Sequence, residues 1–117
     1  MMGRNSFLGS LLLFGALGAN ATLGDCEPPG APPVVPDGSV ASEEALAEAS
    51  GEVRNFVAKS QDYLACLEAR EAELGASITD EMQTEIVTTY NASVETMQEV
   101  ADNFNEQVRR FREQSDG

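Results

Sequence analysis

Between residues 42 and 74, apolar side chains recur in two parallel rows, each with a period of seven residues. Rows of this kind form one stripe along an α-helix and are typical of the seam of a coiled coil. Ser42 offers an N-cap, Ser60 alone interrupts the stripe, and Gly75 follows its last apolar residue, where glycine commonly ends a helix. The pattern therefore predicts a helix between Ser42 and Gly75. Its predicted seam consists of Leu46, Val53, Phe56, Tyr63, Leu67 and Leu74.

The same periodicity restarts after Thr79, and a neighbouring apolar row begins at Val87. Because the loop from Gly75 to Thr79 is short, the two helices are expected to lie antiparallel. Gly51 weakens the first helix, so a break there is an open alternative. No segment alternates as a β-strand does, and the predicted fold is all-α, a coiled-coil-like hairpin of two long helices over residues 42–117. The predicted seam of the second helix consists of Ile86, Tyr90, Val94, Met97, Phe104, Val108 and Phe111.

The first residues are typical of a targeting segment. One positive charge precedes an apolar run over residues 7–17, and small residues follow at the two positions that signal peptidase reads. The run is too short to cross a bilayer, which needs about 20 apolar residues. We therefore predict a signal peptide over residues 1–21, cleaved between Ala21 and Thr22, and a periplasmic or secreted protein without membrane insertion of the mature chain. A lipoprotein signal ending at Cys26 is the weaker alternative, because an acidic residue precedes the cysteine.

Residues 22–41 form a proline-rich arm that cannot be helical, since it holds all five prolines of the chain. As extended polyproline II, the stretch from Cys26 to Ser42 reaches about 50 Å. Cys66 lies only about 36 Å along the predicted helix. The arm can therefore fold back along this helix and meet Cys66. The alternatives are a flexible linker or a tail that docks on a partner.

Cys26 and Cys66 are the two cysteines of the chain. In an exported protein two cysteines most often form a disulfide, and closing a loop of this length contributes about 4 kcal/mol. Two free thiols or an intermolecular bond are the alternatives. The spacing matches neither a zinc site nor a Cys-x-x-Cys redox motif.

The chain carries 20 acidic and 7 basic side chains, a net charge of −13. This excess argues against nucleic acid or an anionic membrane as partner. Three cations, Arg109, Arg110 and Arg112, are expected in the last turns of the second helix, where they suit its negative end. There is no histidine and the single lysine is Lys59, so the chain lacks the usual general base. No catalytic residue, cofactor or metal site is predicted, and the protein is not expected to be an enzyme.

Three short motifs in the arm and the first helix resemble those of small exported proteins of proteobacteria. They are Cys26-Glu27-Pro28-Pro29, Pro36-Asp37-Gly38-Ser39 and Tyr63-Leu64-Ala65-Cys66-Leu67. The likeness extends roughly from Cys26 to Glu68 and leaves out the second helix. It implies a bacterial periplasmic or secreted protein with Cys26 paired to Cys66, and it carries over no catalytic residue.

Two kinds of function fit these observations. The first is a structural or protein-interaction module, an acidic hairpin that binds a partner protein or a second copy of itself. The second is a holdase-like periplasmic chaperone for unfolded or basic envelope proteins. The seam takes up nearly every apolar residue of the helices, which favours the first. Because two helices form only a thin core, we also expect a homodimer in which two hairpins pack as a four-helix bundle.

Overall fold

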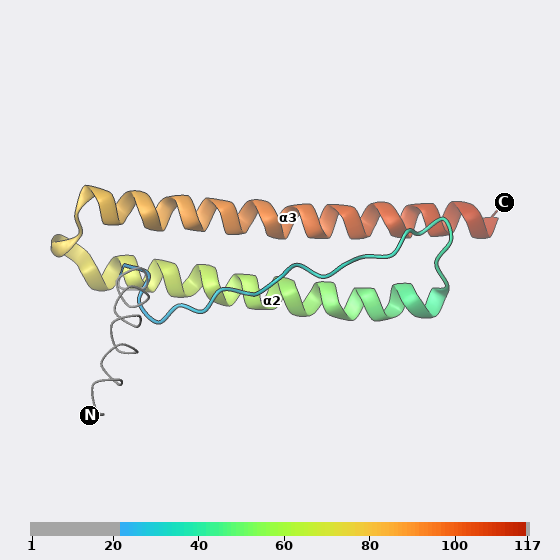
Figure 1. The fold of residues 1–117 in the computed structure, drawn as a ribbon, viewed down its shortest axis with the longest axis horizontal. Helices are drawn as coiled ribbons and strands as arrows, with labels where there is room; N and C mark the ends of the chain where they lie inside the picture. Colours follow the sequence, from blue (N-terminus) through green and yellow to red (C-terminus); the bar gives the residue numbers. More distant parts are fainter. Residues whose placement is uncertain (1–21, 117) are drawn as a thin grey trace, which may run out of the picture.

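A computed structural model describes residues 22–116 of the chain (Figure 1). Two long helices dominate it: α2 spans Glu43–Leu74, with 32 residues, and α3 spans Asp80–Asp116, with 37 residues. They run antiparallel and are joined by the short 3-10 helix η1, Gly75–Ser77. The described residues contain no strand, so the predicted all-α hairpin is confirmed. The predicted signal peptide, residues 1–21, lies outside the described residues.

The helix ends follow from local side-chain chemistry. The Ser42 hydroxyl accepts a hydrogen bond from the backbone N–H of Ala45 at 3.0 Å, which caps the start of α2. At the other end, Gly75 adopts a φ of 48°, a left-handed conformation that glycine takes without strain. The Thr79 hydroxyl accepts from the N–H of Met82 at 3.1 Å and caps α3. The predicted ends at Ser42 and Gly75 are confirmed.

The structure decides three details of the helices. α2 continues without a break through Gly51, because the packed stripe on either side outweighs the weak helix propensity of one glycine. α3 runs on to Asp116, so the three arginines near its end lie in its last turns, as expected, although the final turn itself holds no basic side chain. Val87 is 45% exposed and lies at the margin of the packed stripe, whereas Val94 and Val108 further along the same row are half-buried.

The core between the helices is divided into two clusters. Val53, Phe56 and Val100 form the cluster near the open end of the hairpin. Tyr63, Leu67 and Ile86 form the cluster near its closed end. Between them lies Ser60, which is fully buried and whose hydroxyl has no hydrogen-bond partner among residues 22–116. The interruption of the predicted stripe at Ser60 is therefore also a polar gap in the core.

The two predicted seams differ in how deeply they are buried. Five of the six seam residues of α2 are buried, and Leu74 is half-buried. On α3 Ile86 is buried, whereas the remaining six seam residues are half-buried. The buried set of α3 also includes Val100 and the polar Gln107. The half-buried seam residues of α3 are Tyr90, Val94, Met97, Phe104, Val108 and Phe111.

The arm explains part of this asymmetry. It runs lengthwise along the helix pair, from a position beside α2 near the closed end to the open end beside α3 (Figure 1). Leu23 and Cys26 pack against the closed-end cluster, and Val35 packs against the open-end cluster. The arm thus acts as a third, non-helical layer that covers one side of the seam. None of the helices within residues 22–116 is long and apolar enough to span a membrane.

Candidate interaction surfaces

The arm is attached to the helices mainly at its two ends. Residues 27–36, which we call the strap, form no backbone hydrogen bond among the interactions of the described residues. Prolines occupy five of these ten positions and have no N–H to donate. The path of the strap therefore depends on the packing of half-buried side chains such as Val35 and on the two anchors that flank it.

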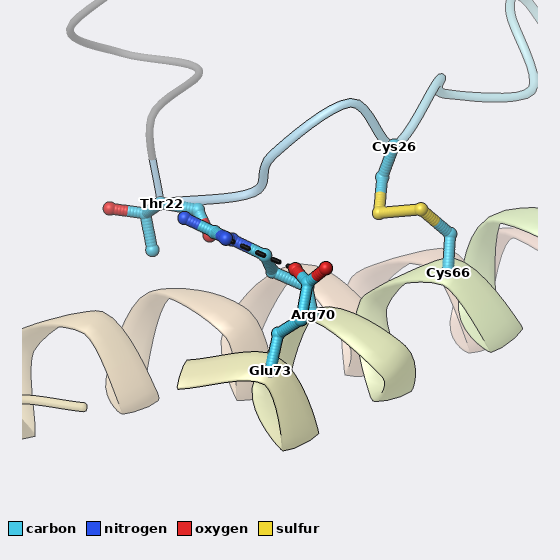
Figure 2. The surroundings of a disulfide bond; sticks show 5 residues. All are labelled: Thr22, Cys26, Cys66, Arg70 and Glu73. Carbon is cyan, nitrogen blue, oxygen red and sulfur yellow. Dashed lines mark hydrogen bonds and ion pairs between the residues drawn. A yellow bond between two sulfur atoms is a disulfide. The ribbon is translucent and has the colours of Figure 1, made fainter. Parts of the chain in front are cut away.

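The first anchor is the disulfide between Cys26 and Cys66, whose Cα atoms lie 5.5 Å apart (Figure 2). This confirms the predicted pairing, and no free cysteine occurs among residues 22–116. One turn further along α2, the Arg70 guanidinium donates to the backbone carbonyl of Thr22 at 3.0 Å and lies 3.2 Å from a carboxylate oxygen of Glu73. A covalent bond and a charged donor on one helix face together fix the start of the arm.

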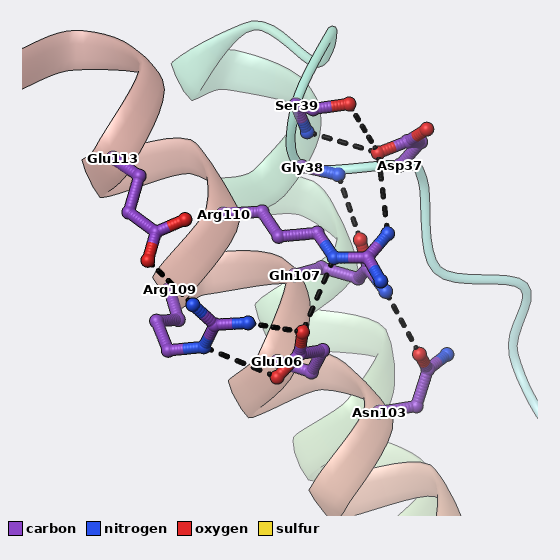
Figure 3. A network of polar contacts seen from close by, with 9 residues as sticks. All are labelled: Asp37, Gly38, Ser39, Asn103, Glu106, Gln107, Arg109, Arg110 and Glu113. Carbon is purple, nitrogen blue, oxygen red and sulfur yellow. Dashed lines mark hydrogen bonds and ion pairs between the residues drawn. The ribbon is translucent and has the colours of Figure 1, made fainter. Parts of the chain in front are cut away.

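The second anchor is a tight turn against α3 (Figure 3). Asp37 begins the turn, and its carboxylate accepts from the Ser39 N–H at 2.9 Å and the Ser39 hydroxyl at 2.7 Å. The buried N–H of Gly38 donates to Oε1 of Gln107 at 2.9 Å, and Gln114 donates to the Gly38 carbonyl at 3.4 Å. A Cβ at Gly38 would lie 1.8 Å from the backbone oxygen of Gln107. Only glycine allows this close approach of arm and helix.

Ion pairs surround the second anchor. Arg110 lies 3.2 Å from Glu106 and 3.9 Å from Asp37, and Arg109 pairs with Glu106 and Glu113 (Figure 3). Hydrogen bonds from Ser39, helped by the charge of Arg110, hold the pKa of Asp37 below its ordinary value. Hydrogen bonding to Arg109, with a smaller contribution from Arg110, lowers the pKa of Glu106 from its ordinary value. Apart from the half-buried Glu106 these groups are exposed, so the network orients the turn more than it stabilises the fold.

The lowered pKa values predict how the second anchor responds to acid. Folding favours the charged forms of Asp37 and Glu106, so their contribution is present above their unfolded-state pKa and is lost as the pH falls through the folded-state value. We expect the turn to loosen below about pH 4. Helix content should hold or rise between pH 7 and that point, because repulsion between acidic side chains four residues apart is relieved.

Far-UV circular dichroism and amide hydrogen exchange of Ser39, both measured from pH 7 to 3, check this prediction. The quantity to compare is the protection factor of the Ser39 amide, the intrinsic exchange rate divided by the observed rate at the same pH. In an Asp37→Asn variant this protection should depend much less on pH. Helix loss above about pH 5 would contradict it, because specific carboxylate pairs would then hold the helices together.

The α3 helix carries an uninterrupted acidic segment. From Asp80 to Val108 the sequence contains seven acidic side chains and neither lysine nor arginine. Six of the seven are exposed, and Glu106 is the half-buried one that pairs with Arg109 and Arg110. The seven residues are Asp80, Glu81, Glu85, Glu95, Glu99, Asp102 and Glu106. Within the hairpin, most of this charge therefore has no cation to neutralise it.

A groove of about 260 Å³ opens beside the closed-end half of this segment. Its apolar floor is formed by Ile86, Val87 and Tyr90 of α3, and its wall by Glu68 and Glu71 of α2. The Tyr90 hydroxyl donates to Glu68 at 3.2 Å, and the charge of Glu68 raises the pKa of Tyr90. We call these five residues the acid-walled groove.

The acid-walled groove and the arm lie on different sides of α2. At about 100° of rotation per residue, Glu68 lies about 200° around the helix from Cys66. The arm therefore leaves the groove uncovered. The sequence analysis treated these acids as a solvated surface, and their grouping around the exposed Val87 becomes visible only when the two helices are paired. Within residues 22–116, no group of three or more metal-ligating side chains is placed to hold an ion.

No protein family, curated protein or solved structure matches the chain. The resemblance to small exported proteobacterial proteins therefore stays an expectation. Function has to be inferred from the surfaces of the hairpin themselves.

Proposed function

We propose that the protein is an exported interaction module that binds a basic protein partner through α3 and the acid-walled groove. The observation that carries the proposal is the run of seven acidic side chains from Asp80 to Val108 without a cation. A surface that carries charge of one sign favours a partner of opposite charge and accelerates its association. The disulfide supports a location outside the reducing cytoplasm, as the predicted signal peptide requires.

The acid-walled groove suggests what such a partner presents. Lysine and arginine side chains combine an aliphatic stem with a charged tip. The stem can pack on the exposed part of Val87. The tip can reach the carboxylates of Glu68 and Glu71, and the ring of Tyr90 offers a cation–π contact. A single basic side chain of the partner would thus use every exposed part of the groove.

A fluorescein-labelled peptide rich in lysine and arginine provides the direct test. We expect saturable binding in fluorescence anisotropy that weakens steadily as salt is raised. A Glu68→Gln/Glu71→Gln variant should bind about tenfold more weakly. The matched control is Glu43→Gln/Glu44→Gln, which removes the same charge from the far end of α2. Equal losses in both variants, or binding that is insensitive to salt, would overturn the proposal.

A homodimer is a second proposal, because six seam residues of α3 stay half-buried in the single hairpin. Sedimentation equilibrium at micromolar concentrations distinguishes a monomer from a dimer. The structure gives less support to a holdase. The large apolar side chains most exposed within the described residues are Val34, Val40 and Val87, and they lie at separate places in the fold. Suppression of aggregation of an unfolded substrate would nevertheless favour that alternative.

A further inference from the structure

We propose that the strap, residues 27–36, is a second recognition element: a proline-rich ligand held ready for a protein groove lined by aromatic side chains and hydrogen-bond donors. This goes beyond the basic partner proposed above, because the strap is uncharged apart from Glu27 and lies on a different side of α2 from the acid-walled groove. Its recognition chemistry is apolar contact and hydrogen bonding rather than ion pairing.

The strap has an inner and an outer side. Pro29, Pro33 and Val35 are half-buried toward the helices. Pro28, Ala31, Pro32 and Val34 are exposed; the first three border hollows between the strap and the helices, and Val34 marks the outer side. Val34 is 87% exposed, more than any other large apolar side chain of the described residues. An extended proline-rich segment whose apolar side chains remain partly accessible is the form in which proline-rich ligands are recognised.

The hydrogen-bonding groups of the strap restrict which kind of partner fits. Because five of its ten residues are prolines, half of its backbone positions cannot donate. Addition of the strap to the edge of a β-sheet needs donors along the strand and is therefore ruled out. The backbone carbonyls form no hydrogen bond within the described residues. The fitting partner supplies donors, such as tryptophan or tyrosine side chains, together with rings that pack on proline.

The two anchors hold the strap in place before any partner arrives. The disulfide at Cys26 fixes one end, and the Gly38–Gln107 hydrogen bond fixes the other. Gly30 has a φ of 89°, which departs from polyproline II, so the straight part of the strap is Ala31–Pro36. Because this part is already ordered by folding, binding it costs less conformational entropy than binding a free peptide.

This chain contains no tryptophan, so tryptophan fluorescence in a mixture comes from the binding partner alone. We would titrate the oxidised protein into a panel of purified SH3 and WW domains that have tryptophan in their proline-binding grooves, and follow tryptophan emission. At least one domain should respond saturably, with little dependence on salt. A Val34→Asp variant should bind about tenfold more weakly. The matched control Val40→Asp, at a valine that is 79% exposed and lies outside the strap and the acid-walled groove, should bind like the original protein. Reduction of the disulfide should also weaken binding.

The outcomes separate the two proposals. If a responding domain bound the Glu68→Gln/Glu71→Gln variant as weakly as it bound the Val34→Asp variant, its binding site would include the acid-walled groove, and the strap proposal would be wrong. The same conclusion would follow if no domain of the panel gave a saturable signal, or if Val34→Asp and Val40→Asp bound equally. Far-UV circular dichroism of each variant confirms that the helices are intact. The basic-peptide experiment is unaffected by any of these results.

Discussion

Replacing Cys26 and Cys66 together by alanine is expected to lower the free energy of unfolding by about 2–4 kcal/mol. The two cysteines are 40 residues apart in sequence, so their bond removes a large amount of conformational freedom from the unfolded chain. Cys26 also packs against the cluster of Tyr63, Leu67 and Ile86, and this contact is lost when the arm is released. For a domain with a thin core, the change is a large share of the total stability.

Urea denaturation followed by circular dichroism measures the effect of the disulfide. Dithiothreitol should destabilise the original protein by a similar amount and should leave the Cys26→Ala/Cys66→Ala variant unchanged. The helices should still form in the variant, because the seam between α2 and α3 does not depend on the bond. Equal midpoints for the oxidised and reduced protein would show that the disulfide contributes nothing to the fold.

Gly38→Ala is expected to cost about 2–4 kcal/mol, since it creates a clash and separates a buried hydrogen-bonded pair. The new Cβ would lie 1.8 Å from a backbone oxygen of α3, which cannot move aside within a helix. The turn must therefore lift away, and the Gly38 N–H loses Oε1 of Gln107. Because the arm can detach, the cost is limited to what docking of the arm contributes. Urea denaturation, with hydrogen exchange at Gly38 and Ser39, measures it.

Two other glycines provide graded controls for this substitution. Gly51 lies exposed inside α2 with open space around a new Cβ, so Gly51→Ala should stabilise the helix by up to about 1 kcal/mol. Gly30 also has open space, but its φ of 89° is unfavourable for alanine, so Gly30→Ala should cost about 1 kcal/mol. If Gly38→Ala cost no more than Gly30→Ala, the close approach of arm and helix would be disproved.

Sequence periodicity was sufficient for the hairpin because its determinants are local. A seven-residue repeat places apolar side chains on one face wherever the helix lies, and Ser42, Gly75 and Thr79 act on their own neighbours. The pairing of Cys26 with Cys66 followed from there being two cysteines and an arm long enough to reach. These features require no knowledge of what lies across the molecule.

Features that depend on distant segments could not be predicted. Nothing in the apolar pattern marks Gln107 as buried, since its burial comes from the turn that docks on it 69 residues away in sequence. The deeper burial of the α2 seam likewise reflects the arm. The acid-walled groove needed the pairing of two helices, because Glu68 and Val87 have no relation in sequence. In the sequence, the one indication of this groove was Val87, an apolar residue at the margin of the stripe.

The polar gap at Ser60 bears on how the molecule assembles. The entropic cost of closing a chain segment grows with its length, so the cluster of Leu67 and Ile86, next to the tight turn, is the easier one to form. From there the pairing of α2 with α3 can extend toward the open end. At Ser60 the next step adds a buried polar side chain and no stabilising apolar contact. We therefore expect partial unfolding to begin at the open end and to stop at Ser60, with the half held by the disulfide still intact.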